Sequence, residues 1–159
     1  MSQASAADIL GKAFLGAVVG GLVGGVVGYG LGYAAGRINE LTLSGEELED
    51  IYVGFAEYAP SGMSAWSMIL CGVLGALAGS VGTAFGTVRE SAATGISVGV
   101  VIVILILLMC FPFPHSAGHW HEDQIVCLVG SISGVCAAVG FVQFLQRSES
   151  PGETAIHSA

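Results

Sequence analysis

The chain has 159 residues, of which 53% are hydrophobic and only 10% are charged, and its net charge is −8. A typical soluble domain contains about 25% charged residues, so this composition, with a mean hydropathy of +0.80, excludes an ordinary soluble fold. Four basic residues are too few for a nucleic-acid-binding surface. The expected partner is therefore the lipid bilayer, and no nucleic acid is expected to bind.

Four apolar segments reach or approach the length of about 20 residues that a membrane-spanning helix requires. In chain order they cover residues 13–36, 65–88, 94–111 and 124–145. Little sequence remains for a soluble domain. The predicted fold class is all-α, a single membrane domain over residues 1–159 built as a bundle of four transmembrane helices, with flexible tails at residues 1–8 and 148–159.

The first segment carries a glycine at every fourth position, namely Gly16, Gly20, Gly24, Gly28, Gly32 and Gly36. Residues four apart share one face of a helix, so these glycines form a bare strip along it. In water each glycine weakens a helix by about 1 kcal/mol relative to alanine, whereas in lipid the backbone must satisfy its own hydrogen bonds. The strip predicts a glycine zipper, a helix face that another helix approaches closely.

The first loop is predicted to contain an amphipathic helix over residues 45–59. Ser44 and Glu47 have capping-box spacing, and apolar residues then recur at helical spacing between acidic ones. We expect this helix to lie at the outer membrane interface. An alternative is that its carboxylates bind a cationic partner or a divalent ion, although the spacing is not that of an EF-hand.

Small residues also recur at spacings of four in the second and fourth segments. The glycines concerned are Gly75, Gly79, Gly82 and Gly86 in the second and Gly130 and Gly134 in the fourth. The third segment has Gly95 and Gly99 near its start and then a continuous run of bulky aliphatic residues over 100–109, which suits contact with lipid. We therefore expect the first segment to pack centrally against the second and fourth, with the third facing outward.

The third loop contains the one cluster of metal-ligating side chains in the sequence, formed by His115, His119 and His121. Imidazole binds zinc and copper, so a metal site is one interpretation of this loop. The spacing matches no established zinc-finger or metalloprotease signature. An interfacial loop without a bound metal is the simpler interpretation.

Three cysteines are expected at the same depth as these histidines, because Cys71 and Cys127 begin their segments and Cys110 ends its own. They would supply further soft ligands for copper or zinc. Alternatives are buried thiols that act as small apolar side chains, or a disulfide between Cys110 and Cys127 on an oxidising face.

The basic residues predict the orientation of the chain. Lys12, Arg89 and Arg147 lie on the side of the membrane that holds the N-terminus, whereas Arg37 alone lies on the other side. Because lysine and arginine are enriched on the cytoplasmic side, both termini are expected inside. A bacterial inner membrane, or an equivalent membrane, is the expected location.

The glycine spacing resembles that of two membrane-protein families, and the resemblance is limited to this spacing. Rotary-ATPase proteolipids carry an ion-binding carboxylate on a helix, which has no counterpart in the spans of this sequence. Mitochondrial inner-membrane preprotein translocases carry a basic loop between helices, whereas the first loop here is acidic. No residue role is carried over from either family.

We expect a small integral membrane protein with a structural or accessory role, whose glycine strip packs helices and supports assembly with itself or with a larger membrane complex. No catalytic constellation is recognisable, so an enzyme is not expected. One alternative is a small channel or transporter for a neutral solute, because no charged residue lies in the middle of a span. Another is an outer-face metal-handling protein that uses the three histidines.

Overall fold

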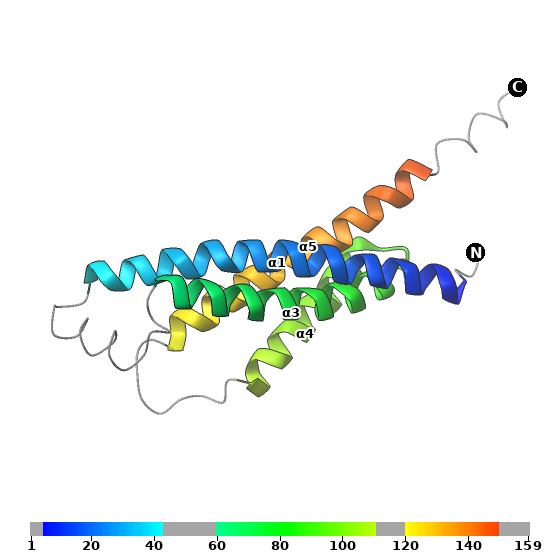
Figure 1. The fold of residues 1–159 in the computed structure, drawn as a ribbon. Coiled ribbons are helices and arrows are strands. Elements are labelled where there is room, and N and C mark those ends of the chain that lie inside the picture. The colour runs from blue at the N-terminus through cyan, green and yellow to red at the C-terminus, as the bar shows by residue number, and fades with distance from the viewer. Residues whose placement is uncertain (1–4, 43–59, 111–119, 150–159) are drawn as a thin grey trace, which may run out of the picture.

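The computed structural model describes residues 5–42, 60–110 and 120–149. They form the helices α1 (Ala6–Thr42), α3 (Pro60–Val88), α4 (Ala92–Cys110) and α5 (Trp120–Glu149), shown in Figure 1. Each helix contains a stretch long and apolar enough to cross a membrane. The expected all-helical fold with four candidate spans is therefore confirmed, while the helix expected over residues 45–59 lies outside the described residues.

Helix α1 begins at Ala6, well before the apolar segment that starts at residue 13. Ser5 caps it, because the Asp8 amide donates a hydrogen bond of 3.2 Å to the Ser5 hydroxyl. The Asp8 carboxylate lies 2.7 Å from the Lys12 ammonium one turn later. The flexible tail expected over residues 1–8 is thus helical from Ala6. With 37 residues, α1 is about 55 Å long and exceeds the hydrocarbon thickness of about 30 Å.

A tight turn joins α3 to α4 and makes them antiparallel. The Ser91 amide donates to the Gly86 carbonyl at 3.0 Å, and the Glu90 amide donates to the Thr87 carbonyl at 3.3 Å. This pair of bonds is the Schellman pattern of a helix C-terminus, which places one residue in the left-handed region. That residue is Glu90, with φ of 52°. Ser91 then caps α4 by accepting a hydrogen bond from the Thr94 amide at 3.3 Å.

Helix α1 lies along α3 and also contacts α5, whereas α4 packs on α3 and α5 (Figure 1). The buried share of the apolar stretch is 50% in α5, 39% in α3, 28% in α1 and 22% in α4. The low value for α4 confirms that this helix faces outward. The expectation that α1 packs against α3 and α5 is confirmed. Helix α1 is not the most buried helix, however, because its glycine face is covered while its opposite face is exposed.

The outer surface of the bundle is apolar, as a lipid-facing surface requires. Large exposed side chains occur on all four helices, among them Leu22, Val26, Leu77, Leu105 and Phe144. The small core holds Ala78, Val103, Val135 and Val139 from α3, α4 and α5. Because lipid tails are as apolar as this core, close packing rather than expulsion of water must hold the helices together.

We expect Glu90→Gly to stabilise the protein by about 1 kcal/mol, because glycine adopts the left-handed conformation without the Cβ penalty. Glu90→Ala is the matched control, since it removes the same charge but keeps the Cβ. The free energy of unfolding in mixed micelles measures both. Equal stabilisation by the two variants would show that the charge, and not the backbone, is responsible.

Candidate functional site

The six glycines spaced by four in α1 are all buried. On the opposite face of the same helix Val18, Leu22 and Val26 are exposed by 41%, 66% and 73%. The glycine face, defined as Gly16, Gly20, Gly24, Gly28, Gly32 and Gly36, therefore points into the bundle. This arrangement places the backbone of α1, rather than its side chains, against the neighbouring helices.

The closest approach between two backbones joins Gly20 of α1 to Gly75 of α3. A Cβ added to either glycine would overlap the carbonyl oxygen of the other. One turn along, a Cβ at Gly24 would lie 2.6 Å from the carbonyl oxygen of Cys71. A Cβ at Gly134 of α5 would lie 3.2 Å from the Cα of Gly24. Any side chain at these positions would force the helices apart.

The other glycines singled out from the sequence divide among three interfaces, those of α1 with α3, α1 with α5 and α3 with α4. Gly79 lies against Gly16, since a Cβ on it would be 2.8 Å from the Gly16 carbonyl oxygen, and Gly130 lies against Gly28. Gly82 and Gly86 do not face α1. They contact α4 at Gly95, where a Cβ on Gly82 would lie 2.7 Å from the carbonyl oxygen.

A second row of glycines on α1 was missed in the sequence. A Cβ on Gly21 would lie 3.2 Å from the Ala76 methyl group, and a Cβ on Gly25 would lie 3.4 Å from the Met68 carbonyl oxygen. The signal was present as the pairs Gly20-Gly21 and Gly24-Gly25. These pairs widen the bare strip, so α3 contacts two adjacent rows of glycines on α1.

The Cys71 side chain fills the space that two glycines leave between α1, α3 and α5. Its sulfur is buried, and a Cβ at Gly28 or at Gly130 would lie 2.7 Å from it. The thiol faces the carbonyl oxygens of Val126 and Cys127 on α5, at 3.6 and 3.9 Å. Cys127 is buried as well. The disulfide between Cys110 and Cys127, one alternative drawn from the sequence, stays a prediction because the side chain of Cys110 lies outside the described residues.

Buried hydroxyl groups add polar contacts along α3. The Thr83 hydroxyl donates to the Ser80 carbonyl at 2.9 Å and also approaches the Lys12 carbonyl of α1 at 3.3 Å. The Thr87 hydroxyl donates to the Thr83 carbonyl at 2.8 Å. In the part of the chain that the structure describes, the buried Ser131 hydroxyl on α5 has no hydrogen-bond partner.

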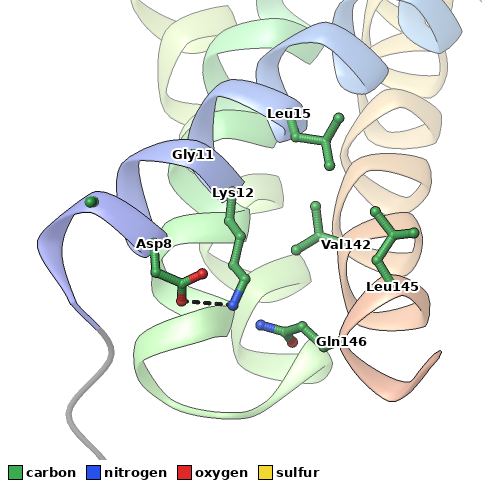
Figure 2. Close-up of a pocket in the computed structure, with 8 residues that line it drawn as sticks. Asp8, Gly11, Lys12, Leu15, Val142, Leu145 and Gln146 are labelled. Atoms are coloured by element: carbon green, nitrogen blue, oxygen red, sulfur yellow. Dashed lines mark hydrogen bonds and ion pairs between the residues drawn. The ribbon is translucent and has the colours of Figure 1, made fainter. Parts of the chain in front are cut away.

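A crevice opens where the start of α1 meets the end of α5. Its volume is about 320 Å³, and it is lined by Ala7, Asp8, Gly11, Lys12, Leu15, Val142, Leu145 and Gln146. Figure 2 shows the Lys12 side chain reaching toward Asp8, with Gln146 projecting from α5 into the same space. No motif in the sequence marks this region.

The histidine cluster lies largely outside the described residues. His115 and His119 are not described, and His121 is placed only as a backbone position in the first turn of α5. Within the described residues no group of three or more histidine, cysteine or acidic side chains is arranged to hold a metal ion. A zinc or copper site at the three histidines stays a prediction.

No family model, no curated protein and no solved structure matches this chain. The contacts between its helices are therefore the observations that bear on its function. They bring together helix backbones, buried cysteine side chains and a few hydroxyl groups.

We expect Gly20→Ala to destabilise the protein by about 1–3 kcal/mol, because the new methyl group overlaps the Gly75 carbonyl oxygen and the helices must separate. Gly30→Ala on the same helix is the matched control, since nothing lies within 4 Å of its Cβ position. The free energy of unfolding of each variant, measured in mixed micelles, gives the difference in stability. Equal effects would show that helix propensity, and not the contact, sets the cost.

If the third loop holds zinc or copper, the protein purified without chelators should retain the metal in stoichiometric amount, and His119→Ala and His121→Ala should remove it. His157→Ala, which changes the one histidine outside that loop, serves as the control. Elemental analysis by mass spectrometry measures the bound metal. A metal-free wild-type protein contradicts the prediction.

Proposed function

We propose that this chain is a small membrane protein with a structural or accessory role, in which α1 acts as a glycine zipper. The observation that supports this role is the backbone contact of α1 with α3 and α5 from Gly16 to Gly28. Lipid supplies no hydrophobic force between helices, so close backbone contact is the main source of association. A chain whose glycines serve this contact is suited to hold helices in fixed positions.

Assembly with further copies, or with a larger membrane complex, is the second part of the proposal. The described part of the glycine face is already covered by α3 and α5 of the same chain. Assembly would therefore use the outward faces, such as the face of α1 that carries Val18, Leu22 and Val26. The internal zipper would keep these outward faces rigid.

We propose a bacterial inner membrane as the location, with both termini in the cytoplasm. Helix α1 begins, α3 turns into α4 and α5 ends at one end of the bundle (Figure 1). Lys12, Arg89 and Arg147 belong to these three places. The excess of positive charge at this end supports the orientation.

Two other functions remain predictions from the sequence. A channel or transporter for a neutral solute would need a path that avoids the contact between Gly20 and Gly75, where no side chain separates the helices. A metal-handling role depends on the histidines of the third loop. Neither has a contact among the described residues that favours it.

In a mild detergent we expect the wild-type protein to purify as a species larger than a monomer, either as an oligomer or with a stoichiometric membrane-protein partner. Gly24→Leu should abolish this species, because the new side chain pushes α3 away and deforms the outward faces. Gly140→Leu, at an open position of α5 and away from the outward face of α1, should leave both the fold and this species intact. Light scattering and quantitative mass spectrometry measure mass and composition.

A monomeric wild-type protein without a stoichiometric partner contradicts the assembly. Flux of a neutral solute through vesicles that contain the protein, above the flux through empty vesicles, would favour the channel instead. The two measurements use the same purified protein, so their outcomes can be compared directly.

A further inference from the structure

The crevice between α1 and α5 changes in polarity along its depth. Its rim carries Asp8 and Lys12 from α1 and Gln146 from α5, whereas its floor is formed by Leu15, Val142 and Leu145 (Figure 2). The polarity of a phospholipid falls in the same order, from its charged headgroup to its aliphatic chains. The volume of about 320 Å³ is of the size that surrounds a small ligand or part of a larger one.

The sequence places the crevice at the start of the apolar segment of α1. Asp8 and Lys12 precede this segment, which begins at residue 13, and Leu15 lies within it. A hydrocarbon boundary near residue 13 would therefore place the rim among the headgroups and the floor among the acyl chains. Lipid is the solvent at this boundary, and a lysine near a helix end extends its ammonium toward the headgroups.

The charges at the rim select the kind of headgroup. The Lys12 ammonium lies 2.7 Å from the Asp8 carboxylate, and the two side chains are exposed by 23% and 42%. The pair is neutral overall, and an exposed pair at this spacing is weak, so both charges can accept a further partner. Gln146 adds an amide that both donates and accepts hydrogen bonds. The rim thus offers one positive and one negative group side by side.

We propose that this crevice binds a membrane glycerophospholipid with an ethanolamine headgroup. The lipid phosphate accepts hydrogen bonds from Lys12 and Gln146, the primary ammonium donates to Asp8, and an acyl chain lies against Leu15, Val142 and Leu145. A choline headgroup has no N–H to donate to Asp8. A headgroup with net negative charge would bring its charge toward that carboxylate without an ammonium to match it.

The test uses full-length protein in a mild detergent, titrated with ethanolamine, choline or glycerol phospholipids that share the same acyl chains. Native mass spectrometry measures the bound fraction of each. We expect the wild-type protein to prefer the ethanolamine lipid over the choline lipid about fivefold, an effect of the size expected for a partly exposed charge-assisted hydrogen bond. Preference for the anionic glycerol lipid over the ethanolamine lipid would overturn the proposal.

The variants separate the two headgroup contacts. Asp8→Asn should remove the preference for the ethanolamine lipid over the choline lipid. Lys12→Gln should reduce the bound fraction of both lipids. Arg89→Gln, which removes a charge at the same end of the bundle but outside the crevice, should leave the preference unchanged. An unchanged preference in Asp8→Asn would overturn the assignment of the ammonium.

Leu15→Trp fills the floor of the crevice and should reduce binding of every lipid. Unchanged binding in this variant would show that the lipids lie around the protein and not in the crevice. Should Leu15→Trp fail to fold, as judged by circular dichroism, the two headgroup variants decide the question by themselves. The proposal does not depend on whether the chain assembles, so it can fail or hold independently of the proposed function.

Discussion

The contact between Gly20 of α1 and Gly75 of α3 is the constraint on which the rest of the bundle depends. Each backbone occupies the space where the other residue would carry a Cβ. In lipid the apolar side chains gain little from leaving their surroundings, so association depends on how closely the helices approach. Dispersion forces weaken steeply with small gaps, and backbones in contact leave no gap. The bare strip on α1 is therefore the main packing surface of the fold.

The positions of α5 and Cys71 follow from this contact. Once α1 and α3 lie together, Gly28 leaves a notch that the Cys71 side chain fills from α3, and Gly130 leaves the matching notch on α5. The buried sulfur faces carbonyl oxygens of α5, so the side chain that fills both notches is also weakly polar. Helix α4 joins through Gly95, away from α1. Helices α3 and α5 each contact all three others, and their apolar stretches have the two largest buried shares.

The sequence was sufficient to predict four apolar helices and the buried face of α1, because helical periodicity determines which residues share a face. It was not sufficient to predict which neighbour covers each face. Gly82 and Gly86 have the same spacing as Gly75 and Gly79 but lie against α4, since spacing carries no information about the partner. The left-handed conformation of Glu90 was also unforeseen, because that position is usually glycine and the turn is set by the packing of α3 on α4.

The crevice between α1 and α5 has the same origin as the glycine contact. Positions 8 and 12 continue the spacing of four toward the start of the helix, but they hold Asp8 and Lys12 instead of glycine. Side chains of this size prevent α5 from approaching as it does at Gly20 and Gly24, although the Lys12 backbone still accepts a hydrogen bond from Thr83 of α3. The helices therefore separate where the glycines end (Figure 1). The residues that end the close contact are the same charged residues that line the opening, so one four-residue register produces both the close glycine contact and the polar rim of the crevice.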